Sequence, residues 1–392
     1  MNKYLVVYLL AFSVFIMASS EIVVAGILPM IARDLHVSVG VAGQLVAAYA
    51  IVIAVGTPIL LSLTSKLERK KLLLLSYSVF NAGNLVAFYS YSFPVLMASR
   101  IIQAASMGVF TVIALTAGAS LAAPEKRGSA IGTIVMGASA ALVLGVPLGT
   151  LIGDYWGWHA IFLLIFIVGT LPIIGIAVLF PKLEPPESVS LKTQLAALRD
   201  RRIGSSLLIT LFWIIGYQTM FTYISPFLQK TADLNYSQIS FALFLSGLFA
   251  VLGSRFGGYG ADRWGAFRIL LVSLLLHAAA LALLPWAAAT FAGALLLLTV
   301  WIGSAYMTTP AQQYYLVSLS PDPSMSGLTL GLNNSILQLG IAIGAGIGGW
   351  VTSRTSVLNL GWVGALSIML SLLAVFYSFS LKSKVAHGRN NE

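Results

Sequence analysis

Cysteine and charge are both scarce in this sequence. The absence of cysteine excludes disulfide bonds, thiolate metal sites, iron–sulfur clusters and cysteine nucleophiles. Only 9% of the 392 residues are charged, whereas an ordinary soluble domain is about a quarter charged. So few charges cannot cover the surface of one or two globular domains. A soluble enzyme is therefore excluded, and the 58% of hydrophobic residues predict a polytopic membrane protein.

Catalytic motifs are missing as well. The sequence contains no H-E-x-x-H, no G-x-S-x-G and no G-x-x-x-x-G-K-[ST]. We therefore expect no enzyme activity, no metal site, no cofactor and no ATP-binding loop. An ion gradient or the gradient of a substrate would have to supply energy for transport.

Long apolar runs dominate the sequence instead. A run of about 18 or more apolar residues can cross the hydrocarbon core as a helix. The runs are too long and too uniform for β-strands of alternating polarity. We predict an all-α membrane protein with twelve spans, at residues 4–32, 41–65, 72–92, 94–122, 128–153, 158–180, 204–229, 237–260, 269–288, 290–319, 326–352 and 357–381.

Lys and Arg indicate the orientation of the chain in the membrane. With both termini in the cytoplasm, the outside segments hold only Arg33, Lys230 and Arg354 of the 22 basic residues. We therefore expect a multi-pass protein of the inner (plasma) membrane with both termini inside. The net charge of +10 then reflects topology, so we expect no nucleic-acid partner. The first run is longer than the core of a signal peptide, and we expect it to be retained as a helix.

The sequence also repeats itself. Gly132, Gly145 and Gly149 each have a glycine counterpart 199 residues later, and Asp34-Leu35 recurs as Asp233-Leu234. Two six-helix halves in parallel pseudo-symmetry are an architecture of secondary transporters. We predict an N-terminal bundle at 1–180, a cytoplasmic linker at 181–203, a C-terminal bundle at 204–381 and a cytoplasmic tail at 382–392.

Three local motifs point to a known family. Residues 258–265 read G-Y-G-A-D-R-W-G, and residues 65–70 read S-K-L-E-R-K in the equivalent loop of the first half. Arg100, Gln103 and Gly108 follow the pattern R-x-x-Q…G. Residues 145–149 read G-V-P-L-G, with Val146 as an extra residue before the proline. The sequence resembles the major facilitator superfamily, in its twelve-helix drug:proton antiporter branch.

Within that branch, the sequence is most similar to bacterial purine base and nucleoside efflux permeases. The similarity rests on G-I-L-P at 26–29, L-E-R-K at 67–70, residues 145–149 and P-A-Q-Q at 310–313. It implies proton-coupled export by alternating access, and it implies gating roles for Lys66, Arg69, Gly258, Asp262, Arg263 and Gly265. Ser65 and Glu68 replace the usual Asp and Gly of the first loop. Relatives with similar motifs export sugars or drugs, so these substrates stay open.

Two charges lie in the interiors of predicted spans, away from their ends. Glu21 is an acidic residue deep in the first span, and Arg100 is a basic residue in the fourth. Ionisable residues at membrane depth are costly and usually functional. We expect Glu21 to bind and release a proton and Arg100 to couple to it across the outer half of the N-terminal bundle. The alternative for Arg100 is a structural role, bonded to helix carbonyls.

Polar side chains gather in the second half. Amides can pair with the edge of a planar base and aromatic rings can stack on its face, although interhelical hydrogen bonding is the alternative for each residue. The candidates for a substrate cavity are Trp213, Tyr217, Gln218, Tyr223, Tyr306, Gln312, Gln313, Asn333, Asn334, Gln338 and, in the first half, Gln44.

Two helices carry stripes of small residues. Gly145, Pro147 and Gly149 mark one, and Gly344 and Gly348 mark the other. Such stripes allow helices to approach closely, and they serve either tight packing or helix movement during transport.

The sequence thus predicts a monomeric proton-coupled exporter of small molecules, with purine bases or nucleosides as the first substrates to consider. Its partners would be a small-molecule substrate, protons and the lipid bilayer. A multidrug or sugar antiporter is the alternative, and a non-transporting membrane sensor is an alternative of another class.

Overall fold

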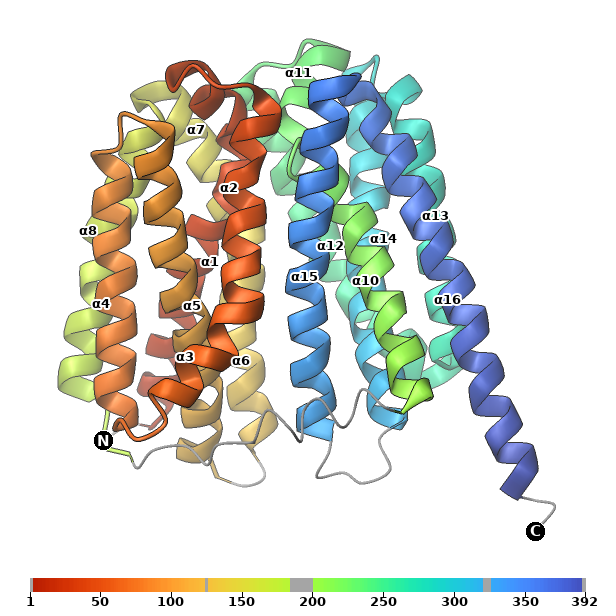
Figure 1. Ribbon diagram of the computed structural model, residues 1–392, viewed down its shortest axis with the longest axis horizontal. Coiled ribbons are helices and arrows are strands. Elements are labelled where there is room, and N and C mark those ends of the chain that lie inside the picture. Colours follow the sequence, from red (N-terminus) through yellow and green to blue (C-terminus); the bar gives the residue numbers. More distant parts are fainter. Residues whose placement is uncertain (1–2, 124–125, 184–199, 320–325, 390–392) are drawn as a thin grey trace. The chain divides into compact units, whose positions relative to one another are not determined.

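The computed structural model describes residues 3–123, 126–183, 200–319 and 326–389. Within these ranges it has twelve helices long and apolar enough to cross a membrane, which confirms the predicted all-helical membrane fold (Figure 1). The elements of the first half are α1 (Lys3–Asp34), α2 (Val39–Ile51), η1 (Val52–Gly56), α3 (Thr57–Leu63), α4 (Arg69–Phe88), α5 (Phe93–Leu121), α6 (Arg127–Ala140), η3 (Ala141–Gly145), α7 (Val146–Trp156) and α8 (Trp158–Leu179). Those of the second half are α10 (Arg201–Phe221), α11 (Ile224–Ala232), α12 (Tyr236–Trp264), α13 (Ala266–Ala287), α14 (Phe291–Ser318), α15 (Ser326–Arg354), η5 (Val357–Asn359) and α16 (Leu360–Arg389).

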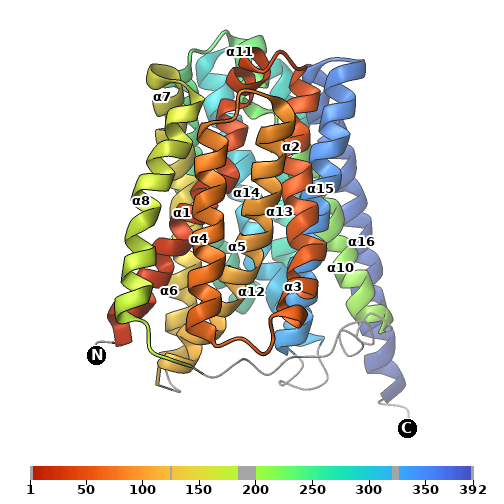
Figure 2. The ribbon, with the colours of Figure 1, turned by 60° about the vertical axis from the view of Figure 1, so that its left-hand side comes forward.

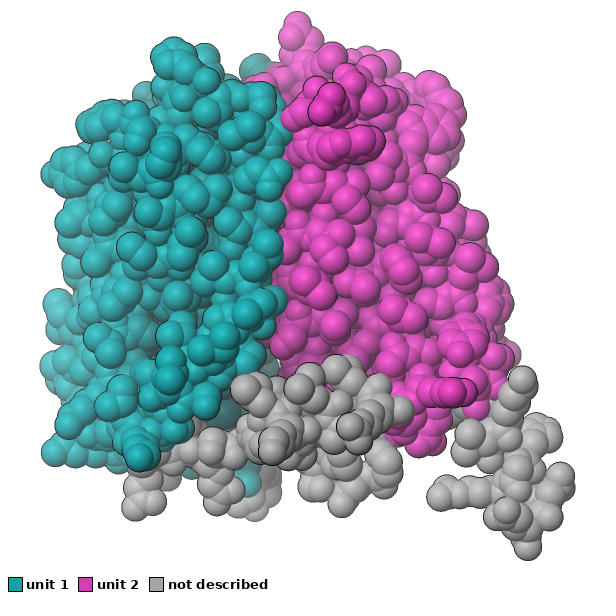
Figure 3. All heavy atoms as spheres, in the orientation of Figure 1, with its two compact units in different colours: residues 1–188, 235–244 teal, residues 189–234, 245–392 magenta. Residues whose placement is uncertain are grey.

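The chain forms two compact units (Figure 3). Unit 1 comprises residues 1–188 and 235–244, and unit 2 comprises residues 189–234 and 245–392. The first residues of α12 therefore belong to unit 1, where the Ser240 hydroxyl donates a hydrogen bond to the carbonyl of Pro147 (2.8 Å).

The predicted seventh span, 204–229, is wrong as one continuous helix. It ends at Phe221, and a separate short helix, α11, begins at Ile224. Pro226 explains the break, because proline has no N–H to donate and its ring clashes with the carbonyl four residues earlier. The remaining spans agree with the prediction to within a few residues.

Two other spans contain a π-helical segment that the sequence analysis did not predict. The segments η1 and η3 each end in a glycine that is followed, two residues later, by a proline, at Gly56–Pro58 and Gly145–Pro147. The i→i+5 bonding of a π-helix accommodates a local disruption of the α-helical ladder. A proline causes such a disruption in both helices, and the ribbon changes direction between α2 and α3 (Figure 1).

The predicted linker and the predicted tail fall only partly on described residues. Most of the predicted linker, residues 184–199, lies outside the described residues. The predicted tail at 382–392 begins as a continuation of α16, which runs to Arg389. No glycine or proline precedes Gly388 there, so the sequence does not end the helix earlier.

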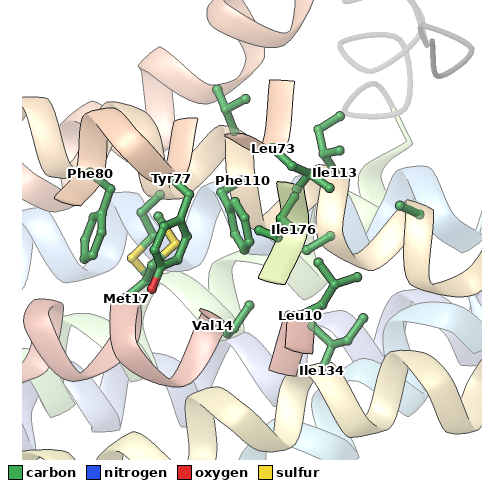
Figure 4. Packing of buried hydrophobic residues seen from close by; sticks show 14 of the residues in the cluster. Leu10, Val14, Met17, Leu73, Tyr77, Phe80, Phe110, Ile113, Ile134 and Ile176 are labelled. Atoms are coloured by element: carbon green, nitrogen blue, oxygen red, sulfur yellow. The ribbon is translucent and has the colours of Figure 1, made fainter. Parts of the chain in front are cut away.

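The first helix of each half lies at the centre of its unit. In both α1 and α10, 78% of the most apolar window is buried, a larger share than in any other described span. In unit 1, α1 contributes Leu10, Val14 and Met17 to an apolar core that also contains Tyr77 and Phe110 (Figure 4). The N-terminus of α10 is capped by Asp200, which accepts a hydrogen bond from Arg202 N (2.8 Å). Hydrogen bonds from the Arg202 side chain also hold the pKa of Asp200 below its usual range.

Glycines allow equivalent helices to pack closely on α1 and α10. A Cβ atom at Gly145 would lie 2.5 Å from Ser19 Oγ of α1, and one at Gly344 would lie 2.7 Å from the carbonyl of Ile215 and 3.0 Å from Gln218 Cβ of α10. Gln218 follows Ser19 by the same 199 residues that separate the two glycines. The internal repeat therefore corresponds to the same helix contact in each unit.

The close contact on α10 can be tested with two alanine substitutions in α15. We expect Gly344→Ala to lower stability by roughly 1–3 kcal/mol, because the new methyl group meets a main-chain carbonyl that cannot rotate away. Gly346→Ala is the matched control, since nothing lies within 4 Å of its added Cβ. The measurement is thermal unfolding of the purified proteins in detergent, and equal melting temperatures for the two variants would contradict the packing.

Candidate functional site

Arg100 of α5 is fully buried inside unit 1. Its Nη1 atom donates hydrogen bonds to the main-chain carbonyl of Ser20 (2.9 Å) and to Gln103 Oε1 (2.6 Å). Its Nη2 atom donates to the main-chain carbonyl of Glu21 (3.1 Å). A buried cation is stable only when its charge and its donors are compensated. Here two carbonyls of α1 and one amide oxygen of α5 provide that compensation.

An amide network continues from this guanidinium towards α4. Gln103 Nε2 donates to Asn84 Oδ1 (3.4 Å), and the Ser20 hydroxyl donates to the same oxygen (2.9 Å). Asn84 Nδ2 donates to the carbonyl of Phe80 one turn earlier in α4 (3.0 Å). Ser20, Asn84, Arg100 and Gln103 are all buried, so α1, α4 and α5 share one polar centre. The ribbons of these three helices are labelled in Figure 2.

Tyr49 of α2 completes the surroundings of Arg100. The guanidinium carbon lies 4.1 Å from the centroid of the Tyr49 ring, within the range of a cation–π interaction. The Tyr49 hydroxyl donates to Met107 Sδ (3.1 Å), and a thioether sulfur is a weak acceptor. Four helices of unit 1 therefore meet at one positive charge.

Glu21 lies in the turn of α1 that holds Arg100. It is partly exposed, and its carboxylate makes no hydrogen bond or ion pair with any described residue. Arg100 reaches Glu21 through the main-chain carbonyl and not through the carboxylate. The structure thus brings the two predicted charges together, but Nη1 and Nη2 of Arg100 donate to helix carbonyls and to Gln103, and the buried Nε has no hydrogen-bond partner among the described residues. A carboxylate beside a fixed cation and without a committed partner can exchange a proton.

Sequence reasoning missed Asn84 and Ser20. Both are small polar residues in long apolar spans. For Asn84 the signal in the sequence is an amide at membrane depth in the third span. Ser20 has no comparable signal. Gln103 was recognised as part of a motif, with no partner assigned to it. Which amides meet depends on how α1, α4 and α5 pack, and the sequence does not show that.

Several of the predicted cavity residues of unit 2 form hydrogen bonds between or within helices. Gln312 donates to the carbonyl (2.6 Å) and hydroxyl (3.1 Å) of Ser206, and Thr210 donates to Asn333 Oδ1 (2.6 Å). The other such contacts are Tyr223 Oη to the carbonyl of Ala345 (2.9 Å) and Gln218 Nε2 to Thr222 Oγ1 (2.9 Å). These four side chains have partners inside the unit.

Tyr217 lies in an aromatic cluster of unit 2. Its ring centroid is 5.1 Å from that of Phe221, 5.2 Å from that of Trp301 and 6.4 Å from that of Tyr306. Trp301 Nε1 donates to His277 Nε2 (2.8 Å), so the unprotonated nitrogen of this imidazole is Nε2. The cluster combines α10, α13 and α14, and Tyr217, Phe221, His277 and Trp301 are buried in it.

The remaining cavity candidates divide by exposure. Gln44, Gln313 and Asn334 are exposed. Trp213 Nε1 and Gln338 Oε1 are buried and have no hydrogen-bond partner among the described residues.

The two signature loops differ in backbone conformation. Gly265, before α13, has φ +85°, a region that favours glycine. Glu68, at the matching place before α4, has φ −55°, so a non-glycine residue fits there without strain. Asp262, Arg263 and Lys66 are exposed, Gly258 is partly buried and Arg69 Nη1 donates to Ser120 Oγ of α5 (3.3 Å). Their gating role stays a prediction.

Nothing in the described parts of the chain resembles a metal centre. No group of three or more His, Cys, Asp or Glu side chains is placed to hold an ion within those ranges.

The amides of α14 offer a direct test of the hydrogen bonds within unit 2. We expect Gln312→Leu to lower stability by about 1 kcal/mol, because it removes an interhelical hydrogen bond of the kind found in membrane bundles. Gln313→Leu, one position later and exposed, should change stability by less than about 0.5 kcal/mol. Chemical unfolding in detergent measures the stability of the two variants. Equal losses of stability would contradict a stabilising role of the Gln312 hydrogen bond.

Comparison with known proteins identifies the fold family. The family model described as Major Facilitator Superfamily matches residues 10–345. Two uncharacterized MFS-type transporters of Bacillus subtilis (strain 168) are similar along their length. YbcL is 37% identical over 380 residues, covering 97% of each chain, and YtbD is 33% identical over 372 residues, covering 94% of each chain.

Two solved structures have the same fold at low sequence identity. The human organic anion transporter MFSD10 (TETRAN) has a TM-score of 0.70 and 17% identity, with 96% of this chain and 100% of that chain covered. A bacterial homolog of the human lysosomal transporter Spinster has a TM-score of 0.75 and 14% identity, with 96% of each chain covered. The helices, the family model and the relatives agree, and the chain belongs to the major facilitator superfamily as a multi-pass membrane transporter.

Proposed function

We propose that the protein is a proton-coupled secondary transporter that exports small molecules, with Glu21 as its proton-binding group. The observation that carries this proposal is the Glu21 carboxylate, which is partly exposed and unpartnered among the described residues beside a buried arginine. An ionisable group at this depth is costly and is usually retained for function. Protons entering from outside would neutralise Glu21 and favour the return to the inward-facing state.

Arg100 supports this role by keeping a positive charge in the turn that carries Glu21. Because its donors bind the carbonyls of Ser20 and Glu21, the guanidinium moves with α1. The cation would therefore stay close to the carboxyl group in every state of the transport cycle. Loss and gain of a proton at Glu21 then change the net charge of the centre between +1 and zero, a large electrostatic difference in an apolar bundle.

Among substrates, planar polar molecules such as purine bases or nucleosides fit unit 2 best. Tyr217, Phe221 and Trp301 supply aromatic rings, which are buried against one another and would have to separate for a planar molecule to stack on them. Gln338, with an unpartnered amide oxygen, and the exposed Asn334 could pair with the edge of such a molecule. Lipophilic cations would require more acidic groups in the binding region than Glu21 alone. We therefore place them, together with sugars, after purines as candidate substrates.

The substrate class can be tested in everted membrane vesicles with an acidic lumen. We expect uptake of one or more radiolabelled purines into vesicles that contain the protein, because the lumen corresponds to the outside of the cell. Transport of a lipophilic cation or a sugar without purine transport would overturn the substrate choice. If no compound of the three classes is transported and none evokes a proton flux, the result favours a non-transporting sensor over a proton-coupled exporter.

The proton site can be tested in the same vesicles with the compound that is transported. We expect Glu21→Gln to lose uptake driven by the pH gradient and to keep substrate exchange at equal pH, since exchange needs no net proton movement. Asp154→Asn, at an exposed acid at the end of α7, is the control and should leave both activities in place. Normal gradient-driven uptake by Glu21→Gln would exclude the proton role.

A further inference from the structure

We infer that Asn84 of α4 is a positioning residue for the proton site: it orients the Gln103 amide and thereby holds the Arg100 guanidinium on α1. The inference rests on the proposed proton role of Glu21. Asn84 makes no contact with Glu21. Its effect on Glu21 passes through the side chains of Gln103 and Arg100.

The orientation of the network starts at a main-chain carbonyl. Asn84 Nδ2 faces the carbonyl of Phe80 (3.0 Å), which can only accept a hydrogen bond. The nitrogen of this amide must therefore point towards Phe80, and the oxygen must point away from it. Asn84 Oδ1 consequently faces Ser20 and Gln103 as an acceptor.

The second amide follows from the first. Because Asn84 presents an oxygen, Gln103 has to present its nitrogen, and Nε2 donates across 3.4 Å. Gln103 Oε1 is then turned towards Arg100 and accepts from Nη1 at 2.6 Å. The opposite orientation of this amide would place an N–H group against the guanidinium, donor against donor.

Packing between α4 and α5 leaves little room for another arrangement. A Cβ atom at Gly83, the residue before Asn84, would lie 2.8 Å from Gln103 Cγ and 3.5 Å from the carbonyl of Ser99. Glycine at position 83 therefore lets α4 approach α5 closely enough for the two amides to meet. The Gln103 side chain is confined between this glycine and Arg100.

The consequence for Glu21 is electrostatic. Among the described residues, Arg100 of α5 is the charged side chain that acts on Glu21, Tyr49 of α2 is the ionisable side chain stacked on that guanidinium, and α4 contributes the neutral Asn84. Arg100 Nη1 is shared between Ser20 and Gln103, so the amide oxygen helps to fix where the positive charge lies. If Asn84 is removed, Gln103 Nε2 loses its acceptor, and the position of the amide is then set only by Arg100 and by the Ser20 hydroxyl (3.5 Å). The acceptor that fixes the guanidinium is therefore less constrained.

The test is an infrared titration of the purified transporter labelled with ¹³C-glutamate. The band of the protonated Glu21 carboxyl group is identified by its absence from Glu21→Gln, and its midpoint pH is measured in each variant. We expect Asn84→Ala to move the midpoint by about half a unit or more, a difference that electrostatic coupling of this kind readily produces. Gln103→Leu should have a similar effect, and the double variant should not exceed the single ones, because both act through the same contact.

Asn81→Ala is the matched control. Asn81 is also a buried asparagine of α4, but its amide donates to the carbonyl of Phe166 in α8 (3.1 Å). Its replacement should lower stability and leave the midpoint of Glu21 unchanged. An unchanged midpoint in Asn84→Ala, or an equal shift in Asn81→Ala, would overturn the positioning role. A wild-type protein without a titrating Glu21 band would instead contradict the proposed function itself.

Discussion

A positive charge buried in an apolar helix bundle has to be compensated, and in unit 1 the compensation of Arg100 determines how four helices meet. Its donors bind two carbonyls of α1 and an amide of α5, and its guanidinium lies on a ring of α2. The amide in turn leads to α4. The removal of any of these partners would leave a buried polar group unsatisfied, which costs about 1–3 kcal/mol or more for a charged group.

The same arrangement leaves the Glu21 carboxylate without a hydrogen bond or ion pair among the described residues. A direct ion pair would tie this carboxylate to the guanidinium and oppose protonation. The main chain of α1 accepts from Arg100 instead, so in the proposed function charge compensation and proton exchange would fall to different atoms of the same turn. Close packing at Gly145 and the matching contact at Gly344 join α1 and α10 to their neighbours in each unit.

The sequence predicts much of the fold because each membrane-spanning helix must by itself be long enough and apolar enough to cross the hydrocarbon core. It also reveals Glu21 and Arg100, since charge is rare and most other charges lie in loops. Hydrogen-bond partners are different, because they depend on which helices pack together. Gln312 and Asn333 are predicted cavity amides, and their hydrogen bonds with Ser206 and Thr210 could not be foreseen from the sequence. Asn84 attracts no notice in the sequence. The break before α11 was missed because Pro226 lies within an otherwise apolar run.

Arg100 binds the main chain of α1, and the Glu21 carboxylate makes no hydrogen bond or ion pair among the described residues. Solid-state NMR in lipid bilayers can measure dipolar couplings from ¹⁵N-labelled arginine side chains to ¹³C in the main-chain carbonyls of serine and glutamate and in the side-chain carboxyl of glutamate. The account predicts couplings from Arg100 to the main-chain carbonyls of Ser20 and Glu21 at hydrogen-bonding distance. A dominant coupling to the Glu21 side-chain carboxyl, assigned by its loss in Glu21→Gln, would contradict it.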